Sequence, residues 1–159
     1  TLLTSSAASD VYKRQGAQLL AKCLGSEITT NKDGLSEIGF YKIEPTENAK
    51  NLFNSQKIFF QFHSEGFSLP TGCELLARGD IFNNQAFKYQ NCYALQFHPE
   101  VNFKLHMRWL YLVLLKNPKK LFVKGAQNIF VQLYYRYKYN KNISNWLDSF
   151  LDQYFLKKT

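Results

Sequence analysis

The chain has 159 residues, 45% of them hydrophobic and 16% aromatic, which is enough apolar material for one globular domain and too much for a disordered chain. Its formal net charge is +8. A Tyr-rich segment, 134–139, lies among the lysines of the last third, so an RNA-binding surface is one hypothesis. We favour a solvated basic surface without a nucleic-acid role, because net charge governs solubility and weak association rather than fold.

The apolar pattern predicts neither a membrane span nor a secreted chain. The longest apolar stretch, 109–115, is shorter than the roughly 20 residues that cross a bilayer, and residues 1–15 lack the apolar core of a signal peptide. Cys23, Cys73 and Cys92 show no metal-ligand spacing, which predicts free thiols in a reducing, cytoplasmic setting. Cys73 and Cys92 are expected in the core, and neither a metal nor a cofactor is expected.

Residues 1–15 differ in character from the rest of the chain. They are rich in Ser, Ala and Thr, turn basic at Lys13 and Arg14, and show no helix or strand pattern. Residues 8–15 resemble translated sequencing-adapter read-through, so we interpret 1–15 as a non-native leader and 16–159 as the domain. A genuinely encoded, disordered N-terminus is the alternative.

From Gly16 the chain alternates clear element patterns with turns. Residues 16–25 predict a helix of good helix formers, with Gly25 suited to its C-terminal stop. Strands are expected at 38–43, 57–62, 73–77, 85–89 and 91–97, with a turn at 69–72. Strands followed by helices indicate the α/β class.

The last third reads as helical. Apolar residues at spacings of three and four (Phe103, Met107, Leu110 and Leu114) predict a well-buried helix that Pro118 ends. Residues 125–136 are ambiguous between helix and loop. An amphipathic helix is expected at 143–155, with Ser144 as its N-cap.

The most informative segment is Leu95-Gln96-Phe97-His98-Pro99-Glu100-Val101. Side chains two residues apart in an extended segment point the same way, so Glu100 can contact His98, fix its tautomer and stabilise its charged form. This is two thirds of a nucleophile–base–orienter triad. Without a nucleophile, His98 would be an ordinary strand-end histidine and Glu100 an acid at a helix start.

Several segments, in order, resemble class I glutamine amidotransferases of the branch similar to the amidotransferase domain of GMP synthase. The matching segments are 16–18 (the tail of Gly-x-Cys-x-Gly-x-Gln), 63–70 (His-Gly-Asp-Thr-Phe-x-Leu-Pro), 84–89 (Asn-Gln-Ala-Phe-x-Tyr), 96–100 (the catalytic His-Pro-Glu), 124–127 and 146–152. The resemblance implies a flavodoxin-like three-layer αβα sandwich with a mostly parallel central sheet, of which this chain would be the incomplete C-terminal part.

The resemblance also implies a chemistry. A Cys thiolate would attack the side-chain amide of L-glutamine, His98 would carry the proton, Glu100 would orient His98, and glutamate and ammonia would result. The substrate-binding residues implied are Gly16, Gln18, His63, Ser64 and Glu65. For His63, a packing role at a strand end is equally open. A synthetase or acceptor partner is implied without being specified.

The match fails at the nucleophile. Laid on the elbow motif, Tyr12 takes the first Gly position and Arg14 the Cys position. A guanidinium stays protonated and cannot attack an amide, and Tyr suits a strained turn poorly. We therefore expect this chain to be inactive as written, with a non-catalytic binding or regulatory homologue as the alternative. Cys23 begins a near match to Cys-x-Gly-x-Gln, but it follows a helix, so we interpret it as structural.

Overall fold

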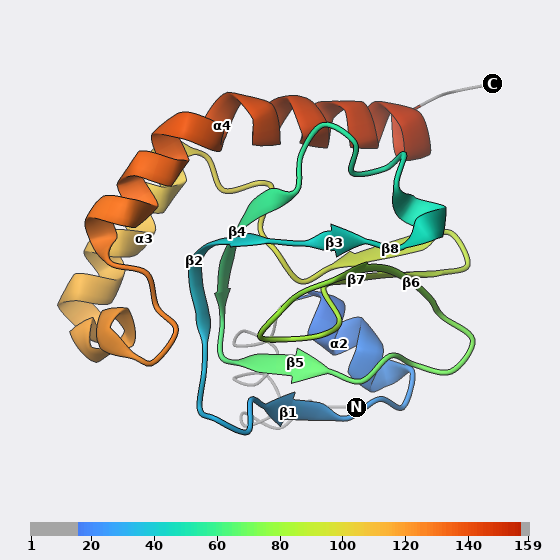
Figure 1. Cartoon of the computed structure of the whole chain (residues 1–159), viewed down its shortest axis with the longest axis horizontal. Helices are drawn as coiled ribbons and strands as arrows, with labels where there is room; N and C mark the ends of the chain where they lie inside the picture. The colour runs from blue at the N-terminus through green and yellow to red at the C-terminus, as the bar shows by residue number, and fades with distance from the viewer. Residues whose placement is uncertain (1–15, 157–159) are drawn as a thin grey trace, which may run out of the picture.

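The computed structural model describes residues 16–156, so the predictions on the leader, Tyr12 and Arg14 lie outside the described residues. The helical elements are α2 (Gly16–Cys23), η1 (Glu47–Ala49), α3 (Phe103–Lys116), η2 (Pro118–Phe122), α4 (Ile129–Leu151) and a terminal π-turn, η3 (Asp152–Leu156). The strands are β1 (Ile28–Thr30), β2 (Glu37–Lys42), β3 (Glu44–Pro45), β4 (Ile58–His63), β5 (Glu65–Phe67), β6 (Glu74–Arg78), β7 (Ala86–Tyr89) and β8 (Cys92–Leu95) (Figure 1).

The described strands form three antiparallel groups. β2 pairs with β4, β1 pairs with β5, and β3, β6, β7 and β8 form a four-stranded sheet in that order. The mostly parallel sheet implied by the resemblance is not formed within residues 16–156, where one parallel bridge joins Ile38 to Ala126. Short connections explain this, because a two-residue turn such as Gln90-Asn91 joins antiparallel strands and parallel pairing needs a long crossover.

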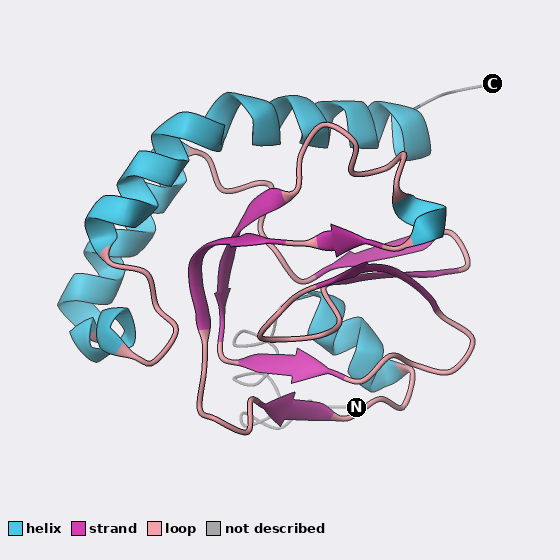
Figure 2. Cartoon of the chain, in the orientation of Figure 1, coloured by secondary structure: helices cyan, strands magenta, loops and turns pink. Residues whose placement is uncertain are grey.

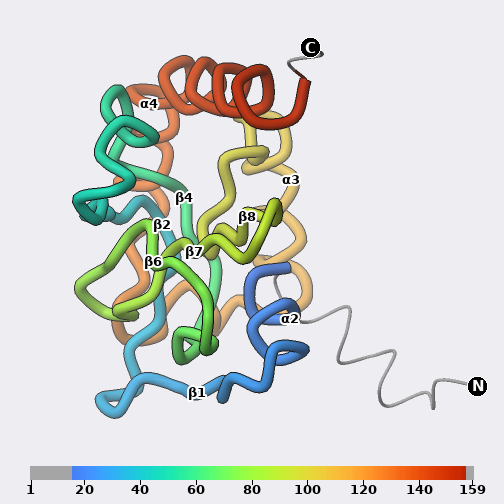
Figure 3. The backbone as a smooth tube through the Cα atoms, turned by 90° about the vertical axis from the view of Figure 1, so that its right-hand side faces the viewer, coloured from blue at the N-terminus to red at the C-terminus, as the bar shows by residue number. Residues whose placement is uncertain are grey.

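Helices cover both sides of the strands (Figures 1 and 2). On one side α2 packs its alanines against β5, β7 and β8, in a cluster of Ala17, Ala21, Phe67, Phe87 and Ala94. On the other side α3 and α4 enclose the larger core, which contains Phe40, Phe53, Phe59, Phe60, Phe97, Trp146 and Phe150. Figure 3 shows α2 and α4 on opposite sides of β7 and β8. Two apolar clusters with strands between them make a three-layer arrangement.

The predicted helix at 16–25 is confirmed, including its stop. α2 ends at Cys23, and Gly25 has a φ of 86°. The Gly25 N–H donates to the Lys22 carbonyl at 3.0 Å, and the Ser26 N–H donates to the Ala21 carbonyl at 2.9 Å. These two bonds form a Schellman motif, which requires a left-handed residue and so favours glycine.

The predicted strands are confirmed in place, with changed ends. The strand expected at 91–97 ends at Leu95, so His98 follows it in an irregular segment. His63 is the last residue of β4 and β5 begins at Glu65, so these residues belong to strand ends rather than to a free loop.

The prediction that α3 is well buried was wrong. Phe103, Met107 and Leu114 are between 40% and 50% exposed, whereas His106 and Leu110 are buried. α3 turns His106 and Trp109 toward β4, and both rings contact Phe60. The apolar period located the helix but not its buried face, because a polar residue, His106, occupies the centre of that face.

The start predicted for the last helix was also wrong. α4 begins at Ile129, and the Asn128 side chain caps it by accepting from the Val131 N–H at 2.9 Å. Ser144 lies inside the helix. Gln132 and Arg136 are buried on its inner face, so polar residues stand where the pattern requires apolar ones, and the first half gave no helical signal. Trp146 and Phe150 are buried as expected.

Within residues 16–156, no helix combines the length and the apolar character needed to cross a membrane.

Candidate active site

His98 and Glu100 are in contact, as the spacing predicts. His98 Nδ1 lies 2.6 Å from Glu100 Oε1. The His98 N–H donates to the Phe60 carbonyl at 2.8 Å, which holds the segment after β8 against β4. The Trp109 indole packs edge-on against the imidazole, with ring centroids 5.2 Å apart. β4 and α3 therefore fix the imidazole between them.

The charge on Glu100 is stabilised by its surroundings. Partial burial by itself raises the pKa of this carboxyl, but the hydrogen bond from His98 and the positive charges of His98 and Arg136 outweigh it. The net result is a pKa below the usual value of a glutamate. An ionised carboxylate on Nδ1 holds the ring proton there, so Nε2 carries the basic lone pair of neutral His98.

A pocket of about 300 Å³ brings together four of the five predicted substrate-binding residues. It is lined by Gln18, Thr30, Ile38, Phe62, His63, Ser64, Glu65 and Lys120. Gly16 is not in this lining and starts α2, two residues before Gln18. The pocket lies one ring away from the His98 pair, because Phe62 contacts Trp109, with centroids 5.6 Å apart, and Trp109 contacts His98.

Three side chains converge on the Glu65 carbonyl. Gln18 Nε2 donates to it at 2.7 Å and Gln96 Nε2 at 3.0 Å. His63 Nδ1 lies 2.9 Å from the same oxygen, so this ring nitrogen donates as well. α2, β4 and the segment leading to His98 thereby fix the backbone of the Ser64–Glu65 turn, which forms one wall of the pocket.

A buried polar chain lies behind His63. Gln85 Nε2 donates to the Phe82 carbonyl at 3.0 Å and to Glu37 Oε2 at 2.8 Å. Because a carbonyl can only accept, this contact fixes the orientation of the Gln85 amide. Gln61 Nε2 then donates to Gln85 Oε1 at 2.7 Å, which leaves Gln61 Oε1 as an acceptor toward His63.

This chain of hydrogen bonds assigns a charge to His63. Its Nε2 lies 3.1 Å from Gln61 Oε1 and 3.0 Å from Glu37 Oε2, and its Nδ1 faces the Glu65 carbonyl. Since every partner is an acceptor, both ring nitrogens carry protons and His63 is an imidazolium paired with the Glu37 carboxylate. The two side chains are 3% and 2% exposed. His63 thus ends a strand and lines the pocket at once.

A second buried cation lies behind Glu100. Arg136 of α4 is fully buried, with its guanidinium 4.8 Å from the Phe40 ring centroid and 5.3 Å from that of Phe60. Its Nε donates to His106 Nδ1 at 3.4 Å. Burial lowers the pKa of Arg136 to about 10, against the opposing effect of the Glu100 charge, and the side chain remains charged at neutral pH.

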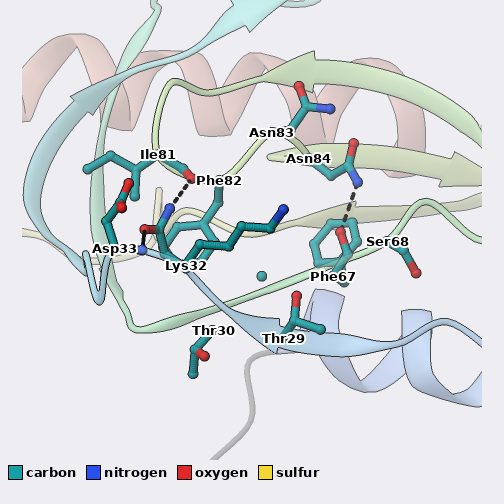
Figure 4. A pocket seen from close by; sticks show the side chains of 12 residues that line it. Thr29, Thr30, Lys32, Asp33, Phe67, Ser68, Ile81, Phe82, Asn83 and Asn84 are labelled. Atoms are coloured by element: carbon teal, nitrogen blue, oxygen red, sulfur yellow. Dashed lines mark hydrogen bonds between the residues drawn. The ribbon is translucent and has the colours of Figure 1, made fainter.

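A larger hollow, of about 410 Å³, lies between β1, β5 and the 81–84 loop (Figure 4). The Lys32 side chain extends along it, and Asn84 Nδ2 donates to the Phe67 carbonyl at its edge. None of the predicted site residues lines it. Size alone would favour this hollow, but the smaller pocket holds the matching chemistry. Among residues 16–156, no group of three or more His, Cys, Asp or Glu side chains is placed to hold a metal ion.

All three cysteines are free thiols. Cys23 is exposed at the end of α2. Cys73 is partly buried against the α2 cluster, and this burial raises the pKa of its thiol. The expectation of a core position was wrong for Cys92, which is exposed, because it begins β8 directly after the hairpin turn at the end of the sheet.

Five site residues were missed from the sequence: Glu37, Gln61, Gln85, Gln96 and Lys120. Gln85 and Gln96 lie inside the matching segments, and a glutamine in an apolar strand is itself a signal of a buried hydrogen bond. Lys120 carried no signal, because one lysine among many reads as surface.

No protein-family model matches the chain. It is 28% identical over 90 residues to one subunit of the glutamine-hydrolyzing GMP synthase of Methanobrevibacter smithii, a match that covers 55% of this chain and 47% of the relative. The corresponding GMP synthase subunit of Methanosphaera stadtmanae is 29% identical over 89 residues, 54% of this chain and 48% of the relative. The chain spans about half the length of the curated relatives it matches.

Solved structures share the fold. A glutamine amidotransferase from Thermotoga maritima superposes with a TM-score of 0.75 and 28% identity, over 87% of this chain and 58% of that one. A glutamine amidotransferase from Methylobacillus flagellatus, at 21% identity, matches with a TM-score of 0.69 over 86% of this chain and 59% of that one, and shows the fold alone. The chain therefore has the class I glutamine amidotransferase fold. Within that class it is a GMP synthase-like glutamine amidotransferase domain.

Proposed function

We propose that this domain belongs to an enzyme that hydrolyses the side-chain amide of L-glutamine with a Cys-His98-Glu100 triad. The observation that carries the proposal is the 2.6 Å contact between His98 Nδ1 and Glu100 Oε1, one aromatic ring away from a pocket lined by Gln18, Ser64 and Glu65. A carboxylate-oriented imidazole beside a polar pocket is the arrangement that amide hydrolysis by a thiol requires.

The residues have distinct roles in this reaction. His98 takes the thiol proton as the sulfur attacks the amide carbon, then delivers it to the leaving nitrogen, so that ammonia departs and a thioester remains. A water then attacks the thioester, with His98 again accepting its proton and returning it to the sulfur. Glutamine and water thereby become glutamate and ammonia. Glu100 stabilises the imidazolium formed in each half-reaction.

The nucleophile position is part of the proposal. In the motif alignment this position is Arg14, which lies outside the described residues, so the chain as written is proposed to be inactive. Both relatives are named as glutamine-hydrolyzing subunits of GMP synthase. By analogy, the partner is a synthetase subunit that consumes the ammonia.

Glutamate release from L-glutamine tests the proposal. The chain as written is compared with a chimera in which the N-terminal part of the Thermotoga maritima amidotransferase replaces residues 1–15 and supplies Cys at position 14. We expect release from the chimera and none from the chain as written. A matched chimera that keeps Arg14 is the control. Release by the chain as written would contradict the assignment of the nucleophile position.

The alternative is a non-catalytic homologue that binds glutamine as a regulatory module. Arg14 itself favours it, because the pocket residues are present while the nucleophile is not. This hypothesis requires the codons for residues 1–15 to be present in the source gene, and nucleotide sequencing of that region decides between the two.

A further inference from the structure

The pocket beside His98 carries a balanced pair of charges. Three ionisable side chains line it: His63, Glu65 and Lys120. Glu37, buried behind the pocket, neutralises His63. One anion and one cation therefore remain for a ligand. The α-carbon of an amino acid carries one ammonium and one carboxylate, which is the complementary pattern.

Lys120 reaches the pocket from a segment that is held in place. Its Nζ lies 5.0 Å from the Phe62 ring centroid, so a cation–π contact directs the ammonium to the pocket wall. Leu121, the next residue, is buried, and the Lys120 N–H donates to the Asn117 carbonyl at 3.1 Å. These contacts fix η2 on both sides of the lysine backbone.

The loop after η2 is pinned to β2. The Ser36 N–H donates to the Lys124 carbonyl at 2.9 Å. The Gln127 side chain pairs with both backbone groups of Phe40, accepting from its N–H at 2.9 Å and donating to its carbonyl at 2.6 Å. Because β2 also carries Glu37 and Ile38, the segment with Lys120 keeps a fixed relation to the pocket.

We propose that Lys120 is a specificity residue that binds the α-carboxylate of the substrate amino acid. The inference rests on the proposed function and goes beyond it, because it explains why the site would take an α-amino acid rather than a simple amide. The neighbouring Lys119 is exposed and does not line the pocket, so it offers a matched control with the same charge in the same turn.

Binding to the full chain tests the inference without any need for turnover. L-glutamine and 4-aminobutanamide, which is glutamine without its α-carboxylate, are titrated by calorimetry into the unsubstituted chain, Lys120→Met and Lys119→Met. We expect Lys120→Met to weaken L-glutamine binding roughly tenfold, the loss of one charge-assisted hydrogen bond. Its affinity for 4-aminobutanamide should stay unchanged, and Lys119→Met should match the unsubstituted chain.

The other outcomes separate the two proposals. If the unsubstituted chain does not bind L-glutamine, the proposed function fails and the inference fails with it. If that chain binds L-glutamine and Lys120→Met binds it equally well, only the inference fails. Equal weakening of both ligands in Lys120→Met would assign the lysine a structural role and also overturn the inference.

Discussion

His106 makes the stability of the fold depend on pH in the acid range. It is fully buried, and its partners keep it neutral. Gln132 Nε2 donates to the Gln127 carbonyl at 2.7 Å, so Gln132 Oε1, 3.2 Å away, accepts from His106 Nε2. His106 Nδ1 in turn accepts from Arg136 Nε. Burial, together with the Arg136 charge, lowers the pKa of His106 from 6.5 to about 4.

The sign and size of the effect follow from this pKa. Between pH 6.5 and about 4 the unfolded chain carries a proton on His106 that the folded chain does not bind. The free energy of unfolding therefore falls as the pH falls through this window, and it recovers above it. At about 1.4 kcal/mol per pKa unit, the loss at pH 4 is up to about 3 kcal/mol.

Urea unfolding followed by circular dichroism at pH 4, 5, 6 and 7 measures this contribution. His106→Gln removes the titrating group, so the stability difference between the unsubstituted chain and the variant should narrow by up to about 3 kcal/mol from pH 7 to pH 4. Carboxylates such as Glu100 titrate in both proteins and cancel. A difference that stays constant across this range would refute a neutral His106.

Three further substitutions test the packing that supports the site, each by urea unfolding. Glu37→Gln leaves the buried His63 charge uncompensated and should cost about 3 kcal/mol, while the exposed Glu47→Gln should be nearly neutral; equal effects would contradict the buried ion pair. Gly39→Ala should cost more than about 1 kcal/mol, since φ is 131° and the new Cβ would lie 2.5 Å from a side-chain oxygen; unchanged stability would argue against the close approach at β2. Trp146→Ala should cost about 3–5 kcal/mol, because its ring stacks 5.5 Å from that of Phe53 in the core; a loss below about 1 kcal/mol would count against that packing.

The elements that could be predicted are those whose apolar pattern agrees with their packing. α2 has small residues facing the sheet and a glycine at its stop, and β4 alternates buried aromatic residues. The His98–Glu100 contact was also predictable, since side chains two residues apart in an extended segment share a face. In each case local sequence and tertiary packing point the same way.

The parts that could not be predicted depend on buried polar groups. Gln132 and Arg136 face the core of α4, and His106 faces it from α3, so the apolar period fails on both helices. Their burial is possible because each finds partners from another element, such as the Phe40 and Phe60 rings for Arg136. Contacts between segments far apart in the chain are not written in either segment alone.

The pocket shows the same limit. Lys120 lies 55 residues after Glu65 in the sequence, and only folding brings them to one lining. The antiparallel ladders likewise follow from the short hairpin connections rather than from the composition of the strands.

The central claim is that His98 is the general base of a glutamine-hydrolysing triad. The most direct measurement is the rate of glutamate release by the chimera with Cys at position 14, compared with the same chimera carrying His98→Gln. Loss of the general base should lower the rate by at least about 100-fold, with circular dichroism showing an intact fold. Equal rates in the two chimeras would contradict the account.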